Sequence, residues 1–563
     1  MDIEDVEYRA DHIEIEELEK ITAETDFYRT VLNKLMSRGS KVIVGPRGVG
    51  KTHHMRIAYK KCIANLSKPL PIYVSYSKYL RLEPLKNTSA IAIQFFHCWI
   101  LCKIILGIKE SLSNLEHKEP TGKINESEIS WDEVKLFCEQ IEKQQQLEWH
   151  ESLLKIISVS FVSELIESLL LITKRKHSII LCDDAALVLT QDYMIEFMDV
   201  FRSLKSSKIS PKASVYPNTE FGPRFHMGHD AESVPCWPSI TDEDYETLFN
   251  DIYHKRFNGE IKEDIKKCFM YACFGAPRAF INLINEFNRS SGTDQQRVNL
   301  VIEGQAKLIE DEYMSLAKKQ PQFKNFVIAG RSILNHAIKE LSEENKKSLS
   351  HNKTQIVLGI KQNETIEKTK KKNINIIIRL LEETGLLQKT TQVKHGKDRV
   401  YDRYIPHFTL LLSNGAFQIG RGSYIGKFTE YIGYTREKHP LRKNSFADFD
   451  VSGLLFDVSL DLPNCAACEK PRSNEEQKFC MHCGVELINK STFEMLVNSK
   501  IETLPITDWQ KKKIKEETEI ETIGDVVLST NPGQELMKAH GIGKHKASHV
   551  IKNAQEWMDE YLS

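Results

Sequence analysis

The chain has 563 residues, and at about 150 residues per domain this length predicts three to four domains, which excludes a single small binding module. Apolar residues make up 41% and charged residues 28%, close to globular averages, so the chain is not predominantly disordered. Lys and Arg number 77 against 78 Asp and Glu, which excludes a chain-wide attraction to nucleic acid or anionic membrane but leaves room for a local basic patch.

Neither a membrane span nor an export signal is predicted. The most apolar window, Ser89 to Ile108, contains Gln94, His97 and Lys103 and is more typical of a buried helix. The N-terminal segment is acidic and lacks the basic and apolar regions of a signal peptide. We therefore expect a cytoplasmic protein with no membrane partner, in which the scattered cysteines are reduced, buried thiols.

The first 296 residues predict a helical lead-in over 1–40, an α/β core over 41–240 and a helical unit over 241–296. Helical periodicity fills the lead-in, and helical stretches separate the short apolar runs of the core. Strands that alternate with helices indicate a parallel sheet. The predicted strands are Lys41–Val44, Leu70–Ser75, His177–Cys182 and Ala213–Tyr216.

Beyond Arg297 the pattern changes. Helices and a basic hairpin near Gly385–Leu412 occupy 297–412, and a connector rich in Gly, Tyr and Arg occupies 413–460. Paired cysteines follow over 461–490, and short helices with Gly turns fill 491–563. Internal repeats and sustained heptads are absent from the sequence.

A phosphate-binding loop follows the first predicted strand and precedes a predicted helix. Its glycines let backbone N–H groups face a β-phosphate, while a lysine neutralises phosphate charge and a hydroxyl ligates Mg²⁺. A chance Gly-rich turn is the alternative, but the flanking strand and helix favour a site for ATP and Mg²⁺. The segment fits G-x-x-x-x-G-K-[ST] with Gly45, Pro46, Arg47, Gly48, Val49, Gly50, Lys51 and Thr52.

Two carboxylates end the third predicted strand. We assign Asp183 to the metal ion and Asp184 to activation of the attacking water. A solvated strand end is the alternative, and the phosphate loop favours the functional interpretation.

Two further polar residues are candidates for contacts with the γ-phosphate. Asn218 follows the fourth predicted strand, although an Asn after a Pro is about as often a turn residue. Arg278, in the segment Gly275-Ala-Pro-Arg278, opens a helix and can reach the phosphate. The alternative for Arg278 is a solvated side chain at a helix N-terminus.

Over roughly residues 20–290 the chain resembles the AAA+ ATPases of the origin-recognition clade and their bacterial relatives. The resemblance is carried, in this order, by GPRGVGKT, LCDD, the polar residue after the fourth strand and GAPR. The resemblance implies an αβα sandwich with a helical lid, and a C-terminal winged helix over 297–412. It matches Lys51 and Thr52 to Walker A, the two aspartates to Walker B, Asn218 to sensor 1 and Arg278 to sensor 2.

This chain departs from that pattern at two points. The second carboxylate is Asp rather than the longer Glu of most AAA+ proteins, which implies slow hydrolysis, and an Asp-Asp pair is also frequent in STAND-type signalling ATPases. The long stretch between Lys51 and Asp183 implies an inserted helical element around 110–175.

The helix and hairpin of the predicted winged helix are basic. Residues 368–399 carry nine Lys or Arg against three acids. Such a helix and wing can bind a duplex through its phosphates, and Lys389, Lys394 and Lys397 are the candidate contacts. Many winged helices contact protein instead, and DNA is modestly favoured.

Four cysteines form two close pairs, Cys465 with Cys468 and Cys480 with Cys483. The spacing C-x₂-C-x₁₁-C-x₂-C predicts a tetrahedral zinc ribbon whose metal stabilises the fold. A redox site would need one reactive pair rather than two.

The segment LMKAHGIGKHKASHVIK near the end of the chain resembles a helix-hairpin-helix motif. The backbone of Gly541 and Gly543 would face a DNA phosphate, and Lys544 and Lys546 would add charge. A protein-docking hairpin is the alternative.

These features predict an ATPase that couples ATP binding and slow hydrolysis to engagement of duplex DNA with weak sequence preference. Replication, a mobile element or defence against one, including antiviral defence, are the candidate settings, and family resemblance favours a bacterial accessory or defence role. A homo-oligomer and an effector protein are further candidate partners. The alternative is a STAND-like signalling switch that senses a nucleic-acid or protein trigger without steady turnover. A third alternative is a nucleic-acid adaptor with a vestigial ATP site.

Overall fold

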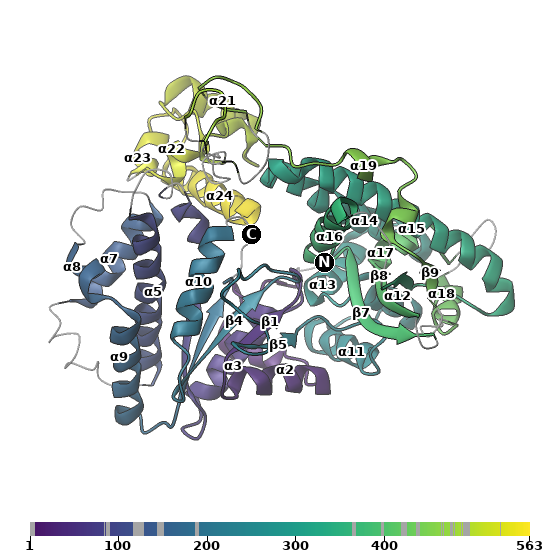
Figure 1. Ribbon diagram of the computed structural model, residues 1–563, viewed down its shortest axis with the longest axis horizontal. Helices are drawn as coiled ribbons and strands as arrows, with labels where there is room; N and C mark the ends of the chain where they lie inside the picture. Colours follow the sequence, from purple (N-terminus) through teal and green to yellow (C-terminus); the bar gives the residue numbers. More distant parts are fainter. Residues whose placement is uncertain are drawn as a thin grey trace.

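The computed structural model describes residues 6–562 apart from 84, 86–90, 116–128, 144–150, 186–190, 363–367, 396–398, 418–424, 435–439, 463, 466, 473–476, 478, 486, 488–495 and 530. Figure 1 shows helices α5 and α7–α9 on one side of a central sheet, a second sheet with long helices on the other side, and a small group of helices above them.

The central sheet has five parallel strands in the order β2-β3-β4-β1-β5. Because β4 lies between β1 and β3, the carboxyl ends of these three strands meet at one edge of the sheet. The prediction of a parallel α/β core is confirmed, although β4 begins earlier than expected and β5 was not predicted. The strands are β1 (Lys41–Val44), β2 (Leu70–Ser75), β3 (Ser178–Asp183), β4 (Ile209–Val215) and β5 (Glu232–Pro235).

Helices cover both faces of this sheet, as the burial of β3 shows. Ile179 and Leu181 pack with α2 and α3, whereas Ile180 and Cys182 pack with α5 and α10. Successive side chains of a strand point to opposite faces, so a fully buried strand needs cover on both. The helices are α1 (Ile15–Lys20), α2 (Asp26–Met36), α3 (Lys51–Ile63), α5 (Ala92–Asn114), α7 (Trp131–Glu142), α8 (Glu151–Ile156), α9 (Val159–Ile172) and α10 (Gln191–Ser203).

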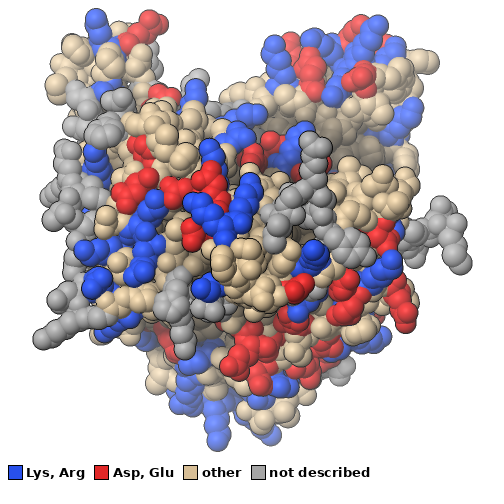
Figure 2. Space-filling view, turned by 90° about the vertical axis from the view of Figure 1, so that its right-hand side faces the viewer, with Lys and Arg blue, Asp and Glu red and all other residues tan. Residues whose placement is uncertain are grey.

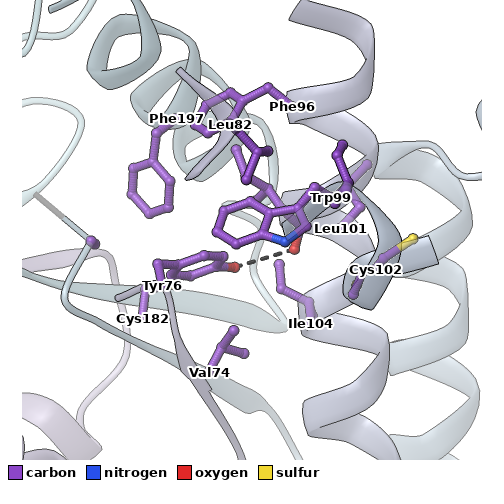
Figure 3. Packing of buried hydrophobic residues seen from close by; sticks show 14 of the residues in the cluster. Val74, Tyr76, Leu82, Phe96, Trp99, Leu101, Cys102, Ile104, Cys182 and Phe197 are labelled. Carbon is purple, nitrogen blue, oxygen red and sulfur yellow. Dashed lines mark hydrogen bonds between the residues drawn. The ribbon is translucent and has the colours of Figure 1, made fainter. Parts of the chain in front are cut away.

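The central helix of this region is α5, which is also the one helix of the described chain long and apolar enough to span a membrane by length and composition. The protein buries 67% of its most apolar window. Trp99 of α5 packs edge-on against Tyr76, which packs in turn against Phe197 of α10 (Figure 3). The Tyr76 hydroxyl donates to the carbonyl oxygen of Ile100 at 3.3 Å. These contacts are those of a core helix.

A helical unit of α11 (Tyr245–Arg256), α12 (Glu263–Ala272) and α13 (Pro277–Arg289) follows the sheet. The N-terminal segment is hydrogen-bonded to it: the Phe27 N–H donates to Asp244, and the Lys255 ammonium donates to the Thr22 carbonyl. The lead-in therefore joins the core to the helical unit.

A second sheet, of order β7-β8-β6-β9, follows in what we call the C-terminal sheet unit (residues 294–457). Its basic hairpin forms as expected, because β7 and β8 pair in antiparallel fashion. The elements are α14 (Asp294–Lys319), α15 (Lys324–Ser348), β6 (Leu358–Lys361), α16 (Lys368–Glu383), β7 (Leu387–Lys394), β8 (Val400–Pro406), α17 (Phe408–Ser413), α18 (Ile425–Ile432), β9 (Leu441–Lys443) and α19 (Leu454–Asp457).

The segment 413–460, which we expected to be a connector, is part of this unit. It supplies β9, which pairs with β6, and it buries Phe446 and Phe449 in the unit's hydrophobic cluster. Phe446 and Phe449 are core residues because the turn that carries them packs on the long helix α15.

The C-terminal helical unit (residues 496–562) consists of α21 (Asp508–Glu517), α22 (Ile523–Val527), α23 (Pro532–Leu536) and α24 (Lys544–Leu562). Its core residues, Val550 and Met558 among them, belong to the same contiguous cluster as α5 and α10. In Figure 1, α24 leads from the upper group of helices back toward the centre of the molecule. Short 3₁₀ turns occur at Tyr79–Leu82, Pro321–Phe323, Leu349–His351, Phe446–Phe449 and Ile501–Thr503.

Candidate functional site: a P-loop cavity and a four-cysteine cluster

The predicted phosphate loop joins the end of β1 to the start of α3. Gly48 and Gly50 have φ values of +83° and +94°, and Lys51 is the first residue of the helix. The Lys51 ammonium lies inside the loop, where it donates to the carbonyl oxygens of Gly45 at 2.6 Å and Pro46 at 2.9 Å. The loop thus directs a helix N-terminus and a buried cation toward one point, an arrangement suited to an anion.

A cavity of about 730 Å³ lies in front of this loop. Six consecutive loop residues line it, together with both aspartates at the end of β3 and Arg278 of α13. The structure therefore brings together groups that are separated by more than 200 positions in the chain. The six loop residues are Arg47, Gly48, Val49, Gly50, Lys51 and Thr52.

The two carboxylates differ in their surroundings. Asp183 is fully buried and accepts hydrogen bonds from the hydroxyls of Tyr73 and Ser214, each at 2.9 Å. Asp184 follows it with φ of +50°, and burial and the neighbouring Asp183 raise its pKa to about 7. Burial lowers the pKa of Lys51 to about 8.

Arg278 lies against the phosphate loop. Its backbone N–H points to the carbonyl oxygen of Gly48 at 3.4 Å, and a Cβ atom built on Gly48 would lie 3.3 Å from the Arg278 Cβ. A side chain at Gly48 would therefore crowd the arginine as well as strain the backbone. Burial lowers the pKa of the Arg278 guanidinium from its usual range.

Asn218 lies elsewhere. It follows β4 with φ of +56°, and its side-chain amide donates to Glu382 of α16 instead of lining the cavity. Tyr216, two residues earlier, takes the place on the cavity wall that we expected for Asn218, with the Lys51 ammonium 4.5 Å from its ring centroid. In this arrangement the predicted contact between Asn218 and a γ-phosphate is not available.

Several other lining residues carry no sequence signal. The N-terminal segment from Tyr8 to His12 borders the cavity because the Arg56 guanidinium holds it on α3 through the carbonyl oxygens of Ala10 and Ile13. Glu556, in the last helix of the chain, also lines the cavity. Their approach depends on contacts between distant parts of the chain.

The donor set fits a nucleoside triphosphate with Mg²⁺. Backbone N–H groups, Lys51 and Arg278 suit phosphate oxygens, and the hard oxygen ligands that Mg²⁺ prefers are available from Thr52 and Asp183. The bound metal would neutralise phosphate charge, and Asp184 would orient a water toward the terminal phosphate. The Arg278 guanidinium would stabilise the charge on that phosphate as the bond to it breaks.

The second predicted site is the four-cysteine cluster. The Sγ atoms of Cys465 and Cys483 are 3.5 Å apart, as are those of Cys468 and Cys480, and all four lie within 4.8 Å of one another. Backbone N–H groups, including that of His482, lower the pKa of Cys480 to about 6. Four thiolates at these separations fit the tetrahedral shell of Zn²⁺, in which Zn–S bonds are about 2.3 Å long.

The predicted nucleic-acid contacts on the basic hairpin differ from one another. The Lys389 ammonium pairs with Asp402 at 3.4 Å and covers the Tyr404 ring, Lys394 is exposed, and Lys397 lies outside the described residues. Figure 2 shows the side of the molecule at the right of Figure 1, where Lys and Arg side chains are interspersed with Asp and Glu side chains. A nucleic-acid phosphate bound on this side would therefore contact individual lysines that have acidic neighbours.

The predicted hairpin lies between α23 and α24. Gly541 has φ of +86° and packs so closely on the Trp509 ring that a Cβ atom would come within 3.0 Å of it, whereas Gly543 faces open space. The Lys546 ammonium lies over the same ring and donates to the Gly541 carbonyl at 3.1 Å. Lys544 is exposed at the start of α24, next to the open side of the turn.

No protein-family model and no curated protein matches the chain. Among solved structures, the chain is similar to a Walker-type ATPase of Pyrococcus abyssi, with 13% identity and a TM-score of 0.37 over 73% of this chain and 98% of that chain. Similarity at this level identifies no family. The chain's own strand order, phosphate loop and facing carboxylates define a P-loop nucleotide-binding core, and the four cysteines form a candidate metal centre.

Zinc content tests the metal centre. We expect one zinc ion per folded, reduced chain and its loss in Cys480→Ser, because three thiolates bind zinc more weakly than four. Elemental analysis of the purified proteins measures this, with Cys62→Ser, a buried thiol outside the cluster, as the control that keeps its zinc. Substoichiometric zinc in the folded wild type would contradict the assignment.

The burial of the Glu382 carboxyl group predicts that the stability of the fold depends on pH. Burial raises the pKa of Glu382 to about 7, above the value of about 4.3 expected in the unfolded chain. The folded state therefore binds this proton more tightly than the unfolded chain does. The resulting contribution to the free energy of unfolding is complete below about pH 4.3 and is lost as the pH rises through about 7. We expect Glu382→Gln to unfold at a temperature about 2–5 °C above wild type at pH 8, and at a similar temperature at pH 4.5.

The thermal unfolding midpoints of wild type and Glu382→Gln, measured from pH 4.5 to 8, test this pH dependence. Glu303→Gln, which changes an exposed glutamate of α14, should follow the wild type throughout. If Glu382→Gln also follows it, the carboxyl group does not titrate between these limits.

Proposed function

We propose that this chain is an ATP-binding, slowly hydrolysing AAA+ ATPase, similar to the origin-recognition clade, that couples its nucleotide state to engagement of DNA. In this proposal the C-terminal sheet unit is a winged helix, the four cysteines form a zinc ribbon, and the C-terminal helical unit is a helix-hairpin-helix domain. On the basis of the resemblance, we further propose a cytoplasmic role in bacterial defence, mobile-element control or replication.

The observation that carries the proposal is direct contact between the C-terminal sheet unit and the phosphate loop. A Cβ atom on Gly385, which follows α16, would lie 3.4 Å from the Pro46 Cβ, and Glu312 of α14 lies 4.0 Å from the Arg47 guanidinium. A phosphate bound in the loop must therefore act on groups that contact this unit. A ligand shifts a conformational equilibrium only through such differential contacts.

The C-terminal helical unit offers a second route between nucleotide and DNA. Helix α24 carries Lys544 at its start and Glu556, a cavity-lining residue, twelve positions later. A rise of about 1.5 Å per residue separates these positions by about 18 Å within one rigid helix. Movement of the helix at the cavity would move the proposed phosphate contacts as well.

Two features support slow hydrolysis. Asp184 is shorter than the usual Glu, and Asn218 is bonded to Glu382 away from the cavity. In an active arrangement the Asn218 amide would have to leave Glu382 of α16.

The sequestered Asn218 also favours the second candidate, a STAND-like switch in which ATP is a structural ligand. In that case bound nucleotide would copurify with the protein and would not turn over. The trigger would be a nucleic acid or a protein recognised by the C-terminal units.

The main test is ATP hydrolysis with and without duplex DNA. We expect slow basal hydrolysis that duplex stimulates, and at least tenfold less activity in Lys51→Ala and Asp184→Asn, because each removes a group that acts on the reacting phosphate. Phosphate release measures this, with Lys61→Ala on the outer side of α3 as the matched control. Bound ATP that never turns over in the presence of duplex would favour the signalling switch.

A second test concerns the hairpin. Lys544→Glu with Lys546→Glu should weaken duplex binding about tenfold or more and flatten its salt dependence, because two phosphate contacts become repulsive. Fluorescence anisotropy over a salt titration measures both quantities. Lys307→Glu with Lys318→Glu, two exposed lysines of α14, makes the same charge change elsewhere. An unchanged affinity and salt slope in the hairpin variant would exclude it as a DNA contact.

A further inference from the structure

Both carboxylate oxygens of Asp183 are held by side-chain hydroxyls from the neighbouring strands. The Tyr73 hydroxyl of β2 donates to Oδ2 at 2.9 Å, and the Ser214 hydroxyl of β4 donates to Oδ1 at 2.9 Å. The strands β2 and β4 flank β3 on its two sides. The carboxylate is therefore held between two fixed points of the sheet.

Ser214 also fixes the residue that follows. The backbone N–H of Asp184 points to the Ser214 Oγ at 2.9 Å and to the Asp183 Oδ1 at 3.1 Å. One hydroxyl thus orients the Asp183 side chain and the Asp184 backbone, whose φ of +50° needs such support.

The position of the Tyr73 ring directs its hydroxyl toward Asp183. Its ring lines the cavity and packs edge-on against Tyr59, with ring centroids 6.3 Å apart. Asp183 is 1% exposed, and its oxygens find these donors in place of water.

The hydrogen bonds to Asp183 use most of the acceptor positions of its carboxylate. A carboxylate has about four lone-pair positions, and Tyr73, Ser214 and the Asp184 N–H occupy three of them. Two of these donors bond Oδ1 and one bonds Oδ2, so the remaining position is on Oδ2 of a residue that lines the cavity. Groups that bond the far side of a ligand in this way orient it, and their loss typically costs about 10–100-fold in metal affinity.

We propose that Tyr73 and Ser214 are positioning residues that orient Asp183 toward the Mg²⁺ of a bound nucleotide. This inference rests on the proposed ATP-binding function. In this proposal two hydroxyl groups, neither of which belongs to a sequence motif, determine how strongly Mg²⁺ increases the affinity for nucleotide.

The test separates metal from nucleotide. The affinity for a fluorescent ATP analogue is measured in excess Mg²⁺ and in EDTA, and the ratio of the two affinities is compared between wild type and variants. Tyr73→Phe and Ser214→Ala should reduce this ratio about tenfold and leave the affinity in EDTA unchanged. Tyr59→Phe, which removes a neighbouring hydroxyl that bonds Asn114, should keep the wild-type ratio, and Ser214→Thr should restore most of it.

An unchanged ratio in both Tyr73→Phe and Ser214→Ala, with thermal unfolding as in wild type, would overturn the proposal. If the wild type binds no nucleotide even in Mg²⁺, the proposed function fails, and binding of Mn²⁺ alone, followed by electron paramagnetic resonance, decides the positioning role. Weaker Mn²⁺ binding in Tyr73→Phe than in Tyr59→Phe would then support it. Equal binding in the two variants, or none in wild type, would overturn it.

Discussion

The pairing of β4 with both β1 and β3 is the constraint on which the rest of the structure depends. It aligns the carboxyl ends of three parallel strands, so that the loop after β1 faces Asp183 and Asp184 after β3 although most of a domain separates them in sequence. The same pairing places Ser214 of β4 beside Asp183. Without the inserted strand, the buried cation of the loop and the buried carboxylates would not share one cavity.

The C-terminal units close this edge of the sheet rather than extending from it. α14 and the turn after α16 touch the phosphate loop, Glu382 holds Asn218, and Glu556 of α24 lines the cavity. A nucleotide would therefore enter a site whose phosphate loop contacts the C-terminal sheet unit and whose lining includes Glu556 of the C-terminal helical unit, the two units that we propose for DNA binding. Any coupling through these contacts would be reciprocal, because a change that DNA binding makes to nucleotide affinity must equal the change that nucleotide binding makes to DNA affinity.

Short sequence motifs predicted the parts of the two sites whose residues are close together in the chain. The spacing of Gly45 to Thr52 and of the four cysteines needs only neighbouring residues, and each set lies together in the structure. Features set by distant contacts escaped prediction. Pro211 and the buried Lys212 interrupt the apolar pattern of β4, β5 buries only one residue, and the partners of Tyr73 and Asn218 lie on other elements. The segment 413–460, which is rich in Gly, Tyr and Arg, also escaped prediction, because Phe446 and Phe449 are buried by packing on α15 and, for Phe446, on Tyr404 of β8.

We propose that nucleotide binding and DNA binding are linked through these contacts. The most direct measurement is the dissociation constant for a short duplex without nucleotide, with ADP and with a non-hydrolysable ATP analogue at one salt concentration. We expect the ATP analogue to change duplex affinity at least fivefold relative to ADP, and Lys51→Ala to abolish the difference. Equal affinities in all three states, for a protein that binds both ligands, would contradict it.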